Sequence, residues 1–155
     1  YYIHFKENIS KMSMFPYVMH CDCQSIAYAV EGTPVAQAYC HCADCRDFYG
    51  ATVLAATAWQ PQSLTVTQGH KALKQHTHTH KKLTRFFCMN CGEVLFGTNR
   101  LGLFVVPNKQ LFRSGDPDLE SLKPNYHLFY RQRIVSIKDH LPKYLDGKNG
   151  ETWSE

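Results

Sequence analysis

Seven cysteines in three clusters are the residues of this chain whose types and spacing best suit chemistry. The central cluster at 40–46 reads CHCADCR and places three thiols within a few residues. One pair, Cys21 and Cys23, precedes it, and a second pair, Cys88 and Cys91, follows it. An odd number of cysteines cannot all pair as disulfides, and C-x-C and C-x-x-C spacings are typical of metal sites in a reducing compartment. We therefore predict metal binding.

Zinc coordination suggests how seven thiols divide, because structural zinc takes four ligands and catalytic zinc takes three and keeps an open position. The two outer pairs would then form a closed four-cysteine site, in which Gly92 supplies the positive φ of a tight C-x-x-C-G turn. Its metal would close a long loop and so contribute to folding stability. The remaining thiols, Cys40, Cys42 and Cys45, would bind a second zinc with its fourth position free.

The fourth position of this second site has an alternative occupant, since His41 or Asp44 could complete a closed site. His41 lies between two cysteines of an expected strand, so its side chain should face away from them. Three thiolates make zinc a weak Lewis acid, which disfavours hydrolysis. A sulfur-rich site instead suits an incoming thiol, which would bind as a thiolate and stay nucleophilic toward a carbonyl carbon. Thiol–aldehyde chemistry at Cys40, Cys42 and Cys45 is the function we expect from the residues alone.

The composition is that of one folded domain, with 155 residues of which 44% are hydrophobic and 19% charged. A net charge of +4 without a block of basic residues disfavours a nucleic-acid partner. The sequence has no apolar run long enough for a transmembrane helix, so no membrane is expected as a partner. Residues 1–16 lack the continuous apolar core of a secretory signal, and we expect a cytoplasmic protein.

Alternating aromatic, β-branched and polar residues predict a mainly β domain over residues 17–146, after a leader at 1–16 and before a loose C-terminal tail at 147–155. A turn at 31–34 should join strands at 23–30 and 35–42 into a hairpin, with the two C-x-C motifs at its open ends. The chain must then bend after Cys42, so that Cys45 comes back to the same point as Cys40 and Cys42. Further strands are expected at 50–58, 64–68, 73–81, 83–87, 94–98, 103–106, 126–130 and 133–137, and a helical turn within 110–122.

Five segments carry a resemblance to a known family: CDC at 21–23, CHCADCR at 40–46 followed by GA at 50–51, FCMNCG at 87–92, and more weakly PNYHLF at 124–129 and DHLPKY at 139–144. They resemble the glutathione-dependent formaldehyde-activating enzymes, a family that includes centromere protein V, over roughly Cys21 to Tyr144. The resemblance implies a β-tent fold built from antiparallel sheets stapled by zinc.

The resemblance also implies two zinc ions per chain. Cys21, Cys23, Cys88 and Cys91 would hold the structural zinc, and the three central cysteines would hold the catalytic one. The implied activity is the condensation of glutathione with formaldehyde to S-(hydroxymethyl)glutathione, or its reversal, formally a carbon–sulfur lyase reaction.

Several polar residues outside the clusters have both a functional and a structural interpretation. Arg46 either orients a substrate carboxylate through a bidentate contact or forms a surface salt bridge. Three alternating histidines would share one strand face and bind a transition metal, or simply form an exposed polar face, which we favour: His76, His78 and His80. Five basic residues would attract an anionic tripeptide or a nucleic-acid backbone, or form a solvated face, which we favour: Lys71, Lys74, Lys81, Lys82 and Arg85.

Two functions are compatible with these residues. The first is a zinc-dependent lyase acting on a thiol–aldehyde adduct, with a small thiol such as glutathione and a small aldehyde as partners and Arg46 as a substrate-binding residue. The second is a non-catalytic zinc module that engages a protein or nucleic-acid partner. The lack of a long basic arm favours the first function.

Overall fold

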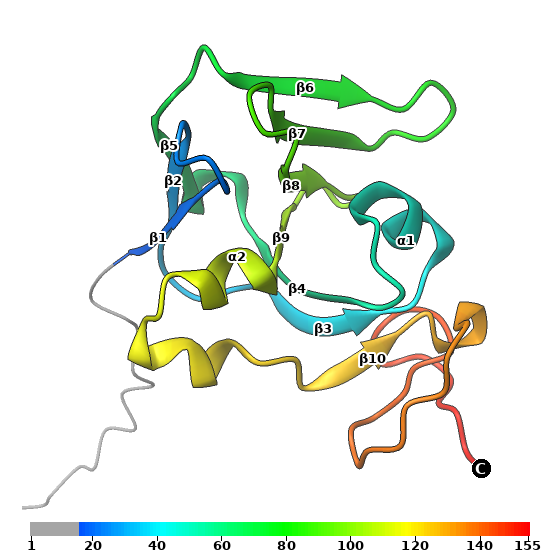
Figure 1. Ribbon diagram of the computed structural model, residues 1–155. Coiled ribbons are helices and arrows are strands. Elements are labelled where there is room, and N and C mark those ends of the chain that lie inside the picture. The colour runs from blue at the N-terminus through cyan, green and yellow to red at the C-terminus, as the bar shows by residue number, and fades with distance from the viewer. Residues whose placement is uncertain (1–15) are drawn as a thin grey trace, which may run out of the picture.

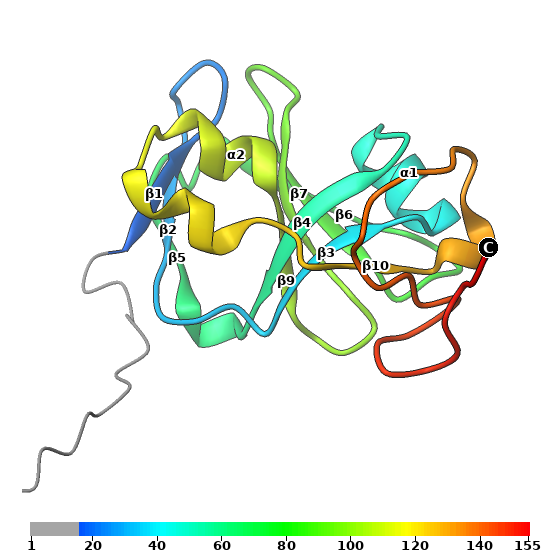
Figure 2. The same ribbon diagram turned by 90° about the horizontal axis from the view of Figure 1, so that it is seen from below.

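The computed structural model describes residues 16–155, so nearly all of the expected leader at 1–16 lies outside the described residues. In the described part, ten strands form a three-stranded and a seven-stranded sheet (Figures 1 and 2). The prediction of a mainly β fold is confirmed. None of the described helices combines the length and the apolar character that crossing a membrane requires.

The smaller sheet has the order β1-β2-β5 and is antiparallel throughout. Its strands are β1 (Tyr17–His20), β2 (Ala27–Val30) and β5 (Leu64–Gln68). In β1 the first and third side chains are buried and the second and fourth are exposed, which is the alternation of a strand with one face on the core. This strand was not predicted, because four residues carry too little alternation to be recognised.

The larger sheet has the order β10-β3-β4-β9-β8-β7-β6. Its strands are β3 (Ala36–Cys40), β4 (Leu54–Trp59), β6 (Leu73–Thr77), β7 (Thr84–Cys88), β8 (Val94–Thr98), β9 (Phe104–Pro107) and β10 (Tyr126–Leu128). All neighbours are antiparallel except β10 and β3, which run parallel and place Leu128 opposite Cys40. The larger sheet is therefore mixed, whereas the smaller sheet is antiparallel as predicted.

The predicted hairpin of residues 23–42 is wrong, because β2 and β3 belong to different sheets. Both ends of the connection between them are bound to the chain around β4 and β5. The Glu31 N–H donates to Ser63 O at 3.0 Å, and the Val35 N–H donates to Ala58 O at 2.7 Å. The backbone groups that a hairpin would pair with each other are thus used by other segments, and the chain crosses from one sheet to the other.

Helical segments account for most of the remaining differences from the predicted strands. The helix α1 (Ala43–Tyr49) was not predicted, whereas α2 (Asn108–Arg113) and the 3-10 turn η2 (Pro117–Leu122) cover the expected helical region. Two further 3-10 turns are η1 (Pro61–Ser63) and η3 (Tyr130–Gln132).

The strand predicted at 133–137 does not form. The Arg133 N–H donates to Tyr130 O at 3.2 Å, and the Ile137 N–H donates to the Tyr130 hydroxyl at 3.1 Å. These local bonds hold the segment around Tyr130 and remove donors that a strand ladder would need.

The C-terminal tail returns to the domain at several points. The Trp153 N–H donates to Lys143 O at 2.7 Å, and the Leu145 N–H donates to Glu151 O at 2.8 Å. The Arg133 guanidinium lies 4.3 Å from the centre of the Trp153 ring, within the range of a cation–π contact. Residues 147–155 are therefore attached to the domain rather than loose.

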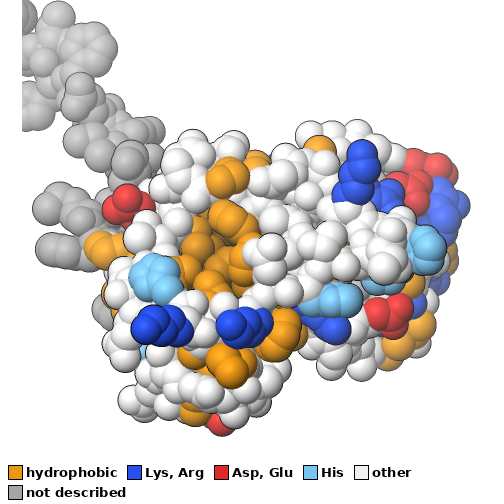
Figure 3. Space-filling view, turned by 90° about the horizontal axis from the view of Figure 1, so that it is seen from above, with side chains coloured by type: hydrophobic (Ala, Val, Ile, Leu, Met, Phe, Trp, Pro, Cys, Tyr) orange, Lys and Arg blue, Asp and Glu red, His pale blue; other side chains and the backbone are white. Residues whose placement is uncertain are grey.

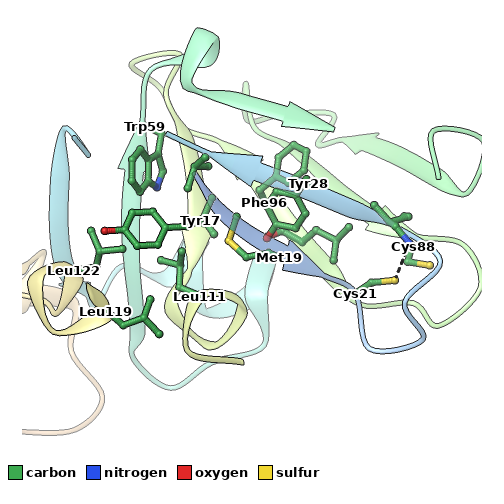
Figure 4. Packing of buried hydrophobic residues seen from close by; sticks show 14 residues of the cluster. Tyr17, Met19, Cys21, Tyr28, Trp59, Cys88, Phe96, Leu111, Leu119 and Leu122 are labelled. Carbon is green, nitrogen blue, oxygen red and sulfur yellow. Dashed lines mark hydrogen bonds between the residues drawn. The ribbon is translucent and has the colours of Figure 1, made fainter. Parts of the chain in front are cut away.

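A cluster of buried side chains lies between the small sheet, α2 and the larger sheet (Figure 4). Tyr17, Tyr28 and Trp59 are its largest members, and the Tyr28 hydroxyl donates to Leu95 O at 3.1 Å. Cys21 and Cys88 lie side by side at one end of the cluster. Two of the predicted metal ligands are therefore part of the hydrophobic core.

Gly69 allows a test of how tightly the β5–β6 turn packs against the segment that follows Cys23. Its φ is +80°, and a Cβ atom there would lie 2.0 Å from Ser25 O. Gly102 has a similar φ of +74° with nothing within 4 Å of its Cβ position. We expect Gly102→Ala to cost about 1 kcal/mol of unfolding free energy from backbone strain alone, and Gly69→Ala to cost about 3 kcal/mol. If urea denaturation shows that both substitutions lower the unfolding free energy equally, the close approach of Gly69 to Ser25 does not contribute.

Candidate metal centres

Four cysteines from two distant segments of the chain converge beside the core. Cys21 and Cys23 lie in the β1–β2 connection, Cys88 ends β7, and Cys91 follows it. Their sulfur atoms all lie within 4.8 Å of one another, with Cys21 and Cys23 3.6 Å apart and Cys23 and Cys88 3.7 Å apart. A tetrahedral zinc with Zn–S bonds of about 2.3 Å would place its sulfurs about 3.8 Å apart. The cluster therefore fits a zinc ion.

Each pair is held by a tight turn. The Gln24 N–H donates to Cys21 O at 2.9 Å, and the Gly92 N–H donates to Cys88 O at 2.8 Å. Gly92 has a φ of +77°, as the C-x-x-C-G pattern predicts. The Ile26 N–H donates to the Cys21 sulfur at 3.3 Å, which helps to stabilise that sulfur as a thiolate.

Glu93 links this cluster to α2. One of its carboxylate oxygens accepts from the Asp22 N–H and from Arg113 Nη1, both at 2.9 Å, and the other accepts from Arg113 Nη2 at 2.6 Å. Burial alone would raise the pKa of Glu93, but its hydrogen bonds with Arg113 lower that pKa from 4.5 to about 2. Because Asp22 separates Cys21 from Cys23, Glu93 fixes the segment that presents both thiols. Glu93 was not among the predicted functional residues.

The three central cysteines also converge. Cys40 ends β3, Cys42 caps the N-terminus of α1, and Cys45 lies in its first turn. Their sulfurs lie within 4.8 Å of one another, and Cys40 and Cys42 are 3.4 Å apart. The predicted bend that returns Cys45 is therefore confirmed, and α1 produces it. The signals that could have predicted this helix are Asp44 in its first turn and Gly50 at its C-cap, where φ is +64°.

The three thiols of this cluster differ in the direction in which their pKa values are shifted. Hydrogen bonds from the thiols of Cys40 and Cys45 lower its pKa, and the Cys45 N–H adds a backbone hydrogen bond of 3.2 Å to the same sulfur. The pKa values of Cys40 and Cys45 are raised, mainly through the same shared bonds. A negative charge at Cys42 is thus stabilised by both neighbouring thiols and by the start of α1.

Neither alternative occupant of the fourth position joins these sulfurs within the described residues. The His41 ring is fully buried, and its Nε2 lies 2.9 Å from Nδ1 of His127. The Asp44 carboxylate pairs with Lys81 and has Arg100 nearby. The chain therefore gathers three ligand atoms at this point and uses His41 and Asp44 for other contacts.

Behind the three-cysteine cluster lies a chain of hydrogen bonds that the sequence analysis did not predict. His127 Nε2 lies 2.8 Å from Asp139, whose other oxygen accepts from Lys143 at 2.6 Å. In the neutral tautomer of His127 that donates from Nε2–H to this carboxylate, Nδ1 is the acceptor for Nε2–H of His41. Burial lowers the pKa of His41 to about 4, so this histidine is neutral at pH 7. The only sequence signal was the weak resemblance of 124–129 and 139–144 to family motifs.

The far end of this hydrogen-bonded chain reaches a cavity of about 890 Å³. Tyr130, Asp139, Lys143 and Trp153 are among its lining residues, and none of the seven cysteines is. The cavity wall and the C-x-C segment at 40–42 are therefore connected through two buried histidines.

The remaining candidate residues lie in different environments. Nη1 of Arg46 donates to the carbonyl oxygen of His41 and, at 2.8 Å, to that of Gln132, so it ties the C-x-C segment to η3. Of the three alternating histidines only His76 lies on a strand, because β6 ends at Thr77. His78 and His80 lie in the following loop, with ring centres 6.2 Å apart. The prediction that the three histidines share one strand face is therefore wrong. The favoured interpretation of an exposed polar segment agrees with the exposure of His76 and His80.

Comparison with known proteins gives a family and a fold. A family model described as "Glutathione-dependent formaldehyde-activating enzyme" matches residues 16–132. Among solved structures, a Rhodobacter sphaeroides protein from a structural genomics programme has a TM-score of 0.51 and 21% sequence identity, over 69% of this chain and 97% of its own. At that identity the likeness concerns the fold alone. A search of curated proteins found no match.

The Glu93–Arg113 pair predicts a defined pH dependence. Its stabilising effect should be complete above pH 4.5, the ordinary pKa of Glu93, and disappear as the pH falls toward 2. We expect Glu93→Gln to lower the unfolding free energy by about 2 kcal/mol at pH 7, and the difference from wild type to shrink between pH 4.5 and 2. Glu120→Gln is the control, because Glu120 pairs with Lys123 at an exposed position. A Glu93→Gln effect independent of pH would contradict this assignment.

Proposed function

Because this chain belongs to the glutathione-dependent formaldehyde-activating enzyme family, we propose that it joins the thiol of glutathione to formaldehyde, or reverses that reaction. The sulfur adds to the carbonyl carbon, and the thiol proton ends on the new hydroxyl of S-(hydroxymethyl)glutathione. In classification terms this is a carbon–sulfur lyase. The observation that carries the proposal is the convergence of three thiols at one point to which neither His41 nor Asp44 adds a ligand atom.

We propose zinc as the metal at both clusters, because thiolate sulfur is its common ligand and the sulfur separations fit its bond length. Cys21, Cys23, Cys88 and Cys91 would hold a structural ion, and Cys40, Cys42 and Cys45 a catalytic one. Bound to three thiolates, zinc would offer a fourth position at which a substrate thiol loses its proton and remains nucleophilic.

The surrounding residues keep the three-cysteine cluster in a fixed arrangement. The His41 N–H donates to Leu128 O at 3.0 Å, and its carbonyl oxygen accepts from Arg46. Its ring is held by His127, so the residue between Cys40 and Cys42 is bound through its backbone and its side chain. A site held in this way loses little conformational entropy when a substrate binds.

Arg46 is also our candidate for orienting a substrate carboxylate. Its Nη1 is bound to two backbone carbonyls, and its other guanidinium nitrogens would be the donors to the ligand. We place the reaction in the cytoplasm, where thiols stay reduced.

Metal content tests the division of the seven cysteines. We expect two zinc ions per chain by elemental analysis, one of which is rapidly removed by a chelator in Cys42→Ser while the other is retained. His76→Ala is the control, since this exposed residue belongs to neither cluster. One tightly held zinc in the wild-type protein would contradict a second, open site.

Exchange NMR tests the substrates directly. We expect the wild-type protein to accelerate exchange between free and formaldehyde-bound glutathione, and Cys42→Ser to reduce the acceleration by at least about 100-fold. An exchange rate unchanged by the wild-type, zinc-loaded protein would disprove the substrate assignment. The non-catalytic zinc module would then be the better proposal.

A further inference from the structure

Two basic side chains from separate loops converge on Asp44, the residue immediately before Cys45. Lys81 comes from the β6–β7 loop and forms an ion pair with one carboxylate oxygen. Arg100 comes from the β8–β9 loop, and its Nη2 lies 3.6 Å from the other oxygen. The hydrogen bond with Asp44 raises the pKa of Lys81, and the charges of Asp47 and Cys42 act in the same direction. The Lys81 ammonium therefore lies beside the turn of α1 that carries the candidate metal ligand Cys45.

The two loops are held in this position by contacts between the β6–β7 hairpin, β8 and α1. The Arg85 guanidinium lies 5.5 Å from the centre of the Phe48 ring of α1, and the Thr84 N–H donates to Thr98 at 3.0 Å. Gly97 leaves room for α1, since a Cβ atom there would lie 2.7 Å from the side chains of both Phe48 and Tyr49. Figure 1 shows the β6–β7 loop on the same side of the molecule as α1. The positions of Lys81 and Arg100 beside α1 are thus fixed by the fold.

Both cations keep donors that residues 16–155 do not use. An ammonium group has three N–H donors, and Asp44 is the partner of Lys81 among the described ion pairs. Arg100 is 79% exposed, and its distance from Asp44 exceeds that of a hydrogen bond, so its guanidinium is free to bind a ligand. Lys81, Arg100 and Arg85 together outnumber the nearby carboxylates of Asp44 and Asp47. Figure 3 shows basic, acidic and histidine side chains mixed at one end of the face that it draws.

We infer that Lys81 and Arg100 select an anionic thiol, binding a carboxylate of the substrate while its sulfur reaches the cluster of Cys40, Cys42 and Cys45. This inference deepens the proposed function and rests on it. Asp44 lies between Cys42 and Cys45 at the start of α1, so its two cations lie beside the segment that presents the sulfurs. Charge-assisted hydrogen bonds from an ammonium and a guanidinium are about twice as strong as neutral ones. A thiol without a carboxylate could not form these hydrogen bonds and should bind more weakly.

A matched pair of ligands and three single variants test this inference. The ligands are glutathione and glutathione diethyl ester, which has the same thiol but no charged carboxylates. Their dissociation constants would be measured by calorimetry with zinc-loaded wild type and with Lys81→Ala, Arg100→Ala and Lys82→Ala. Lys82 is the control, because it is an exposed neighbour on the same loop, and the described ion pairs do not include it.

We expect Lys81→Ala and Arg100→Ala each to weaken glutathione binding by roughly 10-fold, with the ester unchanged, and Lys82→Ala to change neither. Added salt should weaken glutathione binding and leave ester binding unaffected. Equal weakening of both ligands would show that Lys81 only braces the loop, and would overturn the inference. So would unaltered binding in both variants, or no binding of glutathione to the wild type.

Exchange NMR on the same proteins separates this inference from the proposed function. Selective binding of glutathione without accelerated exchange would disprove the lyase activity and leave the anion site standing. If exchange is accelerated but Lys81→Ala and Arg100→Ala change the results for glutathione and its ester equally, the activity is confirmed and the anion site is overturned.

Discussion

The convergence of Cys21, Cys23, Cys88 and Cys91 is the interaction on which the rest of the structure depends. The first pair belongs to the chain between β1 and β2 of the small sheet, and the second pair lies at the end of β7 in the large sheet. A metal at these sulfurs would close a long loop, which lowers the entropy of the unfolded chain. Cys21 and Cys88 also belong to the hydrophobic core, so metal binding and apolar packing would stabilise the same junction.

The second cluster depends on this arrangement of the sheets rather than on its own segment. Cys40 lies opposite Leu128 in the parallel pair of β3 and β10, and α1 packs against β8 where Gly97 leaves space. Three further connections reach the cluster from distant parts of the chain. His41 contacts His127, Arg46 contacts Gln132, and Asp44 contacts Lys81. The small segment that carries the three thiols is thus held on several sides, which is what a preorganised site requires.

The errors of the strand predictions have a common cause. The Glu31–Val35 connection has ordinary turn residues, but its N–H groups are bound by Ser63 and Ala58, and the strands on either side enter different sheets. Alternation of side chains predicts a strand, whereas it does not say which strand is its neighbour. The same holds for residues 133–137, whose backbone donors are taken by Tyr130. Local pattern therefore predicted most strands and failed where backbone donors bond outside the expected ladder, to distant segments at 31–35 and to the nearby Tyr130 at 133–137.

The sequence by itself determined the chemistry that is available to this protein. The number and spacing of the cysteines predicted two clusters, one of four and one of three thiols, because short spacings bring neighbouring sulfurs together in a strand or a turn. Only the tertiary structure decided what surrounds them. The buried pair His41 and His127, the anchoring of α2 by Glu93, and the pairing of Lys81 with Asp44 join residues that are far apart in the chain. Such contacts depend on how strands from two sheets pack, and no spacing along the chain records that packing.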